Sequence, residues 1–247
     1  MSRASVAGLG AAGVRRLLGD GFTHDLPGRI TGRLDVDVWV LDLTGDAYSI
    51  VADGRRVIVA KRTPNWFRQN FSIAHELGHL AADSLCDESL GDAGDHEAAA
   101  NAFAAEFLMP EAELRSFDWQ RLSLPVLAEH LWEWGISTQA LSVRLRSLGL
   151  TPGVETAAAL TLNTQAFLRR HWVWSPGPDP ITLRMELAAE RRVPTELTSL
   201  LEERVAQGLA PVESLAYALG VPASEVEVEL PSLADPDLDR DLLEGLD

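Results

Sequence analysis

Two histidines four residues apart, with a glutamate directly after the first, are the strongest chemical signal in this sequence. His75 and His79 would project from one face of an α-helix, a turn apart, so that two imidazole nitrogens reach one metal ion. Glu76 adjoins them, and its carboxylate could take a proton from water acidified by the metal. The pattern His-Glu-x-x-His therefore indicates metal-assisted peptide hydrolysis, although it also arises by chance.

A catalytic zinc site needs a third protein ligand and one open position. The extended His-x-x-Gly-x-x-His form is excluded, because Ala82 and Leu85 stand where its Gly and last His would be. A glutamate on a later helix is the other common source. Glu97 opens an Ala-rich helical run that Pro110 stops, and Asn101, one turn on, could hydrogen-bond a metal ligand.

The acidic, glycine-containing segment 84–95 between these two regions is predicted to be a loop. Asp95 and His96, at its end, are rival ligands to Glu97. The pattern favours Glu97, since it alone shares a helical face with Asn101 and with small Ala residues that would let two helices approach closely.

Two segments together resemble the ImmA/IrrE family of metallo-endopeptidases in order and spacing. They are F-S-I-A-H-E-L-G-H-L at 71–80 and E-A-A-A-N-A-F-A-A-E-F-L-M-P at 97–110. The resemblance covers about residues 28–150. It implies a zinc ion and four site residues, namely the ligands His75, His79 and Glu97 and the catalytic base Glu76.

Hydrophobic periodicity predicts the elements that must position these residues. Alternating valines in 35–43 indicate a half-buried strand, and the apolar runs 48–51 and 57–60 flank an Asp-Gly pair typical of a hairpin. A small antiparallel sheet should thus precede the metal-binding helix, which begins within 66–72. One hairpin strand could pair with an extended substrate, and the alternative is that the hairpin is only scaffold.

Together these features predict an α+β fold. Residues 1–152 should form a mainly helical, zincin-like peptidase domain of gluzincin type with the small antiparallel sheet. A Pro-Gly pair marks its end, and a mainly helical C-terminal region, 153–247, should follow. Helices are predicted there over 181–208 and 212–229, before an acidic tail.

Residues 124–150 have the pattern of a helix, a turn at Gly135 and a second helix, as in a DNA-binding helix-turn-helix. The first helix carries Glu129 and Glu133 and no basic excess. We therefore interpret the segment as part of the peptidase core or a partner-docking element, as the family resemblance also implies. Direct DNA binding is the alternative.

Charge and composition limit the function classes. The net charge is −16, which disfavours non-specific nucleic-acid binding. The single cysteine, Cys86, excludes an internal disulfide and suits a reducing compartment. Neither a signal peptide nor an apolar run long enough to span a membrane is evident. We therefore expect a cytoplasmic protein that does not bind membranes.

The resemblance also implies a substrate, namely a transcriptional repressor with an XRE-type helix-turn-helix, whose cleavage would relieve repression of stress-response or mobile-element genes. A DNA-binding or protein-binding regulator that retains the zinc fold without cleavage is the alternative, and so is a broad housekeeping protease. Glu76 counts against the regulator, since a structural zinc site needs no base. The oxyanion-stabilising residue stays open among Tyr48, His96, His130 and His171.

Overall fold

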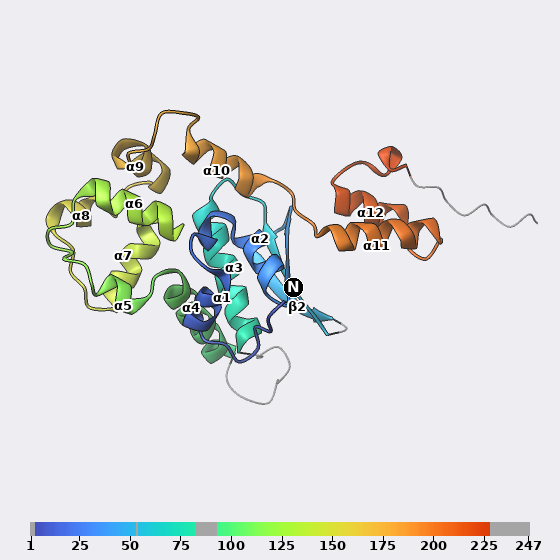
Figure 1. Ribbon diagram of the computed structural model, residues 1–247, viewed down its shortest axis with the longest axis horizontal. Helices are drawn as coiled ribbons and strands as arrows, with labels where there is room; N and C mark the ends of the chain where they lie inside the picture. The colour runs from blue at the N-terminus through green and yellow to red at the C-terminus, as the bar shows by residue number, and fades with distance from the viewer. Residues whose placement is uncertain (1–2, 53, 83–92, 228–247) are drawn as a thin grey trace, which may run out of the picture. The chain divides into compact units, whose positions relative to one another are not determined.

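The computed structural model describes residues 3–52, 54–82 and 93–227, which divide into two compact units, Met1–Arg192 and Val193–Asp247 (Figure 1). The division between the two units falls after residue 192, so that residues 153–192 pack within the first unit. The domain boundary that we expect after residue 152 stays a prediction. All of the candidate site residues lie in the first unit.

The architecture is α+β and mainly helical, as predicted. The first unit has the helices α1 (Ala11–Leu18), α2 (Leu26–Arg33), α3 (Trp66–Ala81), α4 (Ala93–Leu108), α5 (Glu111–Leu114), α6 (Leu124–Trp134), α7 (Thr138–Ser147), α8 (Val154–Ala159), α9 (Thr164–His171) and α10 (Pro180–Ala189), and the 3-10 helix η1 (Phe22–Asp25). Its strands are β1 (Val36–Leu41), β2 (Ala47–Ala52) and β3 (Arg55–Lys61). The second unit has α11 (Thr195–Ala206), α12 (Val212–Leu219) and the 3-10 helix η2 (Ala223–Glu225).

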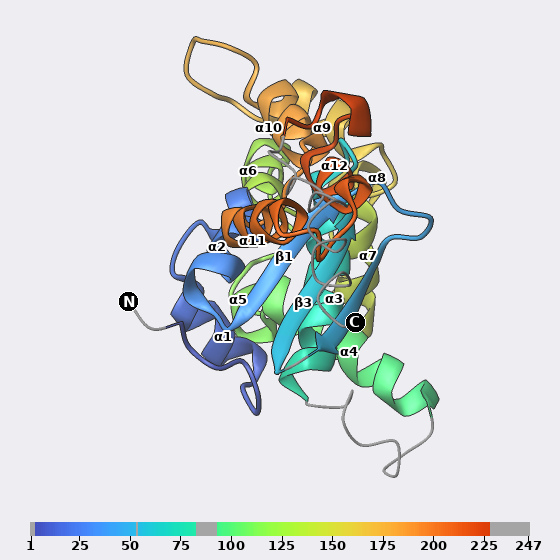
Figure 2. The ribbon, with the colours of Figure 1, turned by 90° about the vertical axis from the view of Figure 1, so that its right-hand side faces the viewer.

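The three strands form one sheet in the order β1-β3-β2. The predicted hairpin is confirmed, because β2 pairs antiparallel with β3. The prediction of a purely antiparallel sheet is wrong, because β1 runs parallel to β3, beside which it lies in Figure 2. Alternation of apolar residues predicts which face a strand buries but not its partner, and here the hairpin places β3 between β1 and β2.

The two edges of this sheet differ. On the β1 side, the backbone of Val40 exchanges hydrogen bonds of 2.8 and 2.9 Å with that of Arg192, which covers part of the edge. On the β2 side, no strand pairs with the outer edge within the described ranges. β2 also packs against α3. It is therefore the strand whose backbone stays available beside this helix.

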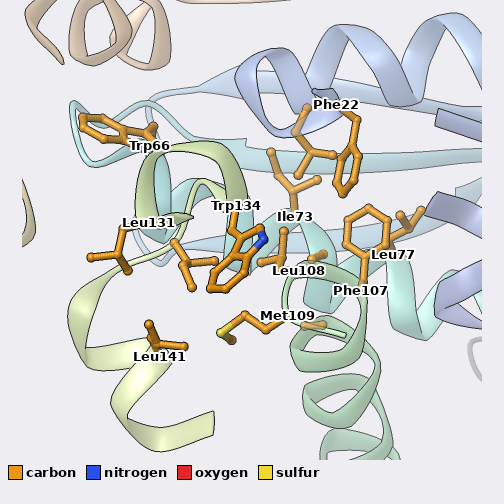
Figure 3. Packing of buried hydrophobic residues seen from close by; sticks show 14 of the residues in the cluster. Phe22, Trp66, Ile73, Leu77, Phe107, Leu108, Met109, Leu131, Trp134 and Leu141 are labelled. Atoms are coloured by element: carbon orange, nitrogen blue, oxygen red, sulfur yellow. The ribbon is translucent and has the colours of Figure 1, made fainter. Parts of the chain in front are cut away.

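Helix α3 joins the core to the candidate site. Its stripe of Ile73, Leu77 and Leu80 is fully buried or nearly so, which confirms the predicted spacing. Figure 3 shows Ile73 and Leu77 packed among side chains of η1, α4 and α6, including Phe107 and Trp134. Burial of each such large apolar side chain stabilises the fold by about 1.5–3 kcal/mol. The stripe therefore anchors the helix that carries the two histidines.

The predicted helix-turn-helix is present as α6, a turn and α7. Gly135, which ends α6, has a left-handed φ of 62° that favours glycine. Asn70 of α3 donates hydrogen bonds of 3.1 Å to the carbonyl oxygens of Gly135 and Thr23. Arg184, whose pKa burial lowers to about 9, donates to the carbonyls of Trp132 and Thr23 at 2.7 Å. The turn is thus fastened to α3, as expected for a segment of the peptidase core.

Three boundary predictions need correction. Residues 93–95 of the expected loop are helical, because α4 already begins at Ala93, and residues 83–92 lie outside the described ranges. The helix predicted over 181–208 is two helices, since Pro194 cannot continue a helix and precedes the start of α11. The last predicted helix ends at Leu219, where Gly220 has a φ of 75°. The acidic tail is not among the described residues.

Within the described part of the chain, no helix is both long and apolar enough to cross a lipid bilayer.

Candidate metal centre

Three side chains from α3 and α4 converge on one point. The Nε2 atoms of His75 and His79 are 3.2 Å apart, and each lies 3.2 Å from a carboxylate oxygen of Glu97. Ligands that bind zinc tetrahedrally at roughly 2.0–2.1 Å are separated by about 3.3 Å. The contacts with Glu97 use different oxygens, Oε2 for His75 and Oε1 for His79, and one ligand atom from each of the three side chains lies within 4.8 Å of the others. The three side chains can therefore surround one metal ion. Among the described residues, these three form the group of histidine, cysteine and acidic side chains whose ligand atoms lie close enough together to bind one metal ion.

A glycine allows α3 and α4 to approach at this place. Gly78 lies between the two histidines, and a Cβ atom there would be 3.1 Å from the Cα atom of Ala100 and 3.1 Å from the Cβ atom of Phe103. Ala100 is buried and stands one turn after Glu97 on α4. The close contact of the two helices thus brings the Glu97 carboxylate to the histidines. This agrees with the expectation that small residues let the helices approach.

Asn101 of α4 orients the first histidine. Its Oδ1 atom lies 3.1 Å from Nδ1 of His75, and an amide oxygen can only accept, so the N–H of Nδ1 donates this hydrogen bond. The lone pair of Nε2 then points toward the cluster formed by His75, His79 and Glu97. The hydrogen bond expected from Asn101 is therefore present. The side chains of His75 and His79 are 17% and 13% exposed, whereas that of Glu97 is 61% exposed. The cluster thus opens to solvent on the α4 side.

Ser49 is a site residue that the sequence analysis missed. Its hydroxyl donates a 2.7 Å hydrogen bond from β2 to Oε2 of Glu76. Its neighbours Tyr48 and Ile50 are exposed, at 47% and 41%, so that Ser49 occupies the position of the strand that faces α3. A polar residue at a helix-facing strand position was the signal available in the sequence. The bond fixes the carboxylate of Glu76, the residue that follows the ligand His75 on α3.

The other candidates from the sequence lie in varied surroundings. His130 stacks on Trp134 with ring centroids 4.9 Å apart, and burial lowers the pKa of its imidazole. His171 packs against Phe167 at 4.8 Å. Both histidines are thus engaged in aromatic packing outside the cluster.

Three further candidates lie nearer to the cluster. His96 lines a small pocket together with His79, and Tyr48 adjoins Ser49 on β2. The convergent group contains Glu97 and neither Asp95 nor His96. This arrangement supports Glu97 over its two rivals as the third ligand.

Comparison with known protein families agrees with this geometry. Residues 32–146 match the family model of the IrrE N-terminal-like domain, peptidase family M78. The matched region runs from the end of α2 to α7, and it includes the metal cluster, Glu76 and the helix-turn-helix segment. A search of curated proteins finds no significant match to the chain. This match supports the assignment of residues 32–146 to the ImmA/IrrE family of metallopeptidases.

Proposed function

We propose that this protein is a zinc-dependent endopeptidase with the metal ligands His75, His79 and Glu97. The observation that carries the proposal is the convergence of three ligands: the two imidazole nitrogens are 3.2 Å apart, and each lies 3.2 Å from a different oxygen of the Glu97 carboxylate. Among the described residues no fourth side chain joins this group, which leaves one position of a tetrahedral zinc ion without a protein ligand. A structural zinc site would fill that position with a fourth protein ligand. The two nitrogen donors and one carboxylate suit zinc better than the hard cations magnesium and calcium, which prefer oxygen ligands.

Glu76 is the proposed general base. A zinc ion in this site would supply the Lewis acidity that amide hydrolysis needs. The Glu76 carboxylate accepts a proton from the attacking water, whose oxygen forms a bond to the scissile carbonyl carbon. Glu76 then passes this proton to the amide nitrogen as the carbon–nitrogen bond breaks. Ser49, which donates to Oε2, keeps the carboxylate in place through both transfers.

The edge strand β2 is the proposed support for the substrate backbone. Its outer edge is unpaired within the described ranges, and its Ser49 contacts the proposed base. An extended peptide that adds to this edge would run past Glu76, with backbone hydrogen bonds fixing its position. This arrangement supports the proposal that the hairpin has a role in substrate binding as well as a scaffold role.

We propose a transcriptional repressor with an XRE-type helix-turn-helix as the substrate, cleaved to relieve repression of stress-response or mobile-element genes. Support comes from the match of residues 32–146 to the IrrE N-terminal-like domain, together with the resemblance of the two motif segments to the ImmA/IrrE family. The net charge of −16 is unsuited to binding operator DNA directly, and so favours a protein target.

The test is intact-mass analysis of the helix-turn-helix repressor encoded nearest this gene, after incubation with zinc-loaded protein. The expected result is a single cut by the wild type and none by Glu76→Gln, which should still bind zinc because Glu76 is not a ligand. Equal cleavage by both proteins would contradict the role of Glu76. An uncut repressor in the presence of the zinc-loaded wild type would contradict the proposed substrate.

A further inference from the structure

A cleft of about 890 Å³ extends along the first half of α3, and its lining residues include neighbours of the metal centre but none of the metal ligands. Two of its lining residues connect it to the site. Asn101 hydrogen-bonds His75, and Ser72 lies four residues before Glu76, on the same face of α3. A volume of this size is typical of a ligand site. The cleft therefore ends about one helical turn from the proposed catalytic residues.

Its walls offer apolar surface and uncharged polar groups. The large apolar side chains in its lining are Phe67, Phe71, Met109, Val143, Leu160 and Leu162. The other lining residues are mostly small or neutral, and the charged ones are Asp46, Arg68 and Arg144.

Each of these charges already has a partner of opposite sign. Arg68 pairs with Asp46 at 2.6 Å, and Arg144 pairs with Glu106 and also donates to the carbonyl of Met109 at 3.2 Å. The cleft therefore selects for apolar and neutral groups rather than for a charged ligand.

The second helix of the helix-turn-helix forms one wall of this cleft. Gln139, Val143 and Ser147 are spaced by four residues and so lie on one face of α7, and all three line the cleft. Val143 is 54% exposed, whereas Leu141 and Leu145, on the opposite face, are buried in the core. The exposed face of α7, which would contact bases in a DNA-binding protein, here lines this cleft.

The two contacts of β2 with α3 relate the cleft to Glu76, beside which the scissile bond of a substrate would lie. Asp46, just before β2, pairs with Arg68, and Ser49 bonds Glu76, so that β2 runs beside α3 in the same direction. The eight residues from Arg68 to Glu76 span about 12 Å of helix. An extended chain covers that length in about four residues.

We propose that this cleft holds the polypeptide substrate on one side of the scissile bond and selects an apolar side chain within about four residues of that bond. The inference rests on the proposed peptidase function and specifies the substrate that the site accepts. The face of α7 with Gln139, Val143 and Ser147 is the specificity-determining wall, and Phe71 and Leu162 provide further apolar surface.

The test uses a synthetic library of random decapeptides. Zinc-loaded wild type and Val143→Arg are each incubated with it, and the products are sequenced by mass spectrometry. The wild type should enrich an apolar residue within four positions on one side of the cut. Val143→Arg should lose that preference, and kcat/KM for a preferred peptide should fall about 10-fold or more, chiefly through KM. Val154→Arg is the matched control, since Val154 is 88% exposed on α8 and outside the cleft.

A binding measurement separates this inference from the peptidase proposal. Zinc-loaded Glu76→Gln, alone or combined with Val143→Arg or Gln139→Arg, is immobilised and the retained library peptides are sequenced. The inference is supported if Glu76→Gln retains apolar peptides and if each added cleft substitution abolishes that retention. This result would support the cleft even if the wild type cuts no peptide, and then only the peptidase proposal would fail. The inference would be overturned if the wild type cleaves the library while the cleft variants show the same cleavage-site preference and retain the same peptides as the proteins without the cleft substitution.

Discussion

Replacement of Gly78 by alanine should weaken zinc binding by moving two helices apart. The new Cβ atom would stand 3.1 Å from Cα of Ala100 and from Cβ of Phe103, both of which are fixed to the backbone of α4. Carbon atoms in good contact are about 3.5–4.0 Å apart, so α4 must move by at least about 0.4 Å. Metal–ligand distances tolerate only about 0.2 Å. The displacement therefore exceeds the tolerance at Glu97, and we expect zinc affinity to fall about 10- to 100-fold.

The assay is competition of the zinc-loaded protein against a chelator of known affinity, with thermal unfolding of the metal-free protein measured in parallel. Overpacking at Gly78 costs about 1–3 kcal/mol, and the better helix propensity of alanine offsets up to about 1 kcal/mol of this cost. The matched control is Gly32→Ala in α2, where a Cβ atom would have no neighbour within 4 Å. That variant should keep wild-type zinc affinity and gain about 0.5–1 kcal/mol of stability.

Wild-type zinc affinity in a folded Gly78→Ala variant would refute the reasoning, because Glu97 would then not depend on the close contact between α3 and α4. A loss of zinc affinity in Gly32→Ala of the same size would also refute it, since the effect would not be specific to the helix interface.

Three further predictions concern other contacts of the same unit. Ser49→Ala should lower kcat about 10-fold, with zinc affinity and KM unchanged, because the hydrogen bond to Glu76 is lost. Ser49→Thr should restore most of the wild-type kcat, and equal steady-state kinetics in all three proteins would contradict the positioning role. Gly135→Ala should destabilise the fold by roughly 2–4 kcal/mol in urea denaturation, because φ is 62° and a Cβ atom would lie 2.5 Å from Nδ2 of Asn70; an unchanged midpoint would contradict this. Burial lowers the pKa of His130, so the folded state binds a proton less readily than the unfolded state, and the stability present above about pH 6.5 is lost as the pH falls. His130→Phe should therefore lose less stability than the wild type between pH 7.5 and 5.5, as measured by denaturation at each pH.

The parts of the fold that depend on local chemistry could be predicted from the sequence. The spacing of Ile73, Leu77 and Leu80 predicted the buried stripe of α3, and the Asp-Gly pair predicted the β2–β3 hairpin. The motif histidines could be proposed as ligands because helical periodicity places them on one face, and Glu97 because it shares a face with Asn101 and because the family resemblance agrees. The stripe, the hairpin and the histidine pair were thus predicted from residues that lie close together in the sequence.

The parts that depend on contacts between distant segments could not. The parallel pairing of β1 with β3 and the bond from Ser49 to Glu76 join residues whose proximity no local pattern encodes. The role of Gly78 as a contact surface is likewise visible only once α4 lies against it, because the same residue in isolation indicates a weak helix position. The start of α4 at Ala93 was missed because a nearby glycine suggested a loop.

The measurement that tests the central claim most directly is the zinc content of the purified protein. The protein is dialysed against buffered zinc, and its zinc is determined by inductively coupled plasma mass spectrometry. The account predicts one zinc per chain in the wild type and in Glu76→Gln, and loss of that zinc in His79→Ala and in Glu97→Ala. A wild type that binds no zinc, or a Glu97→Ala variant that retains zinc with unchanged affinity, would contradict the account.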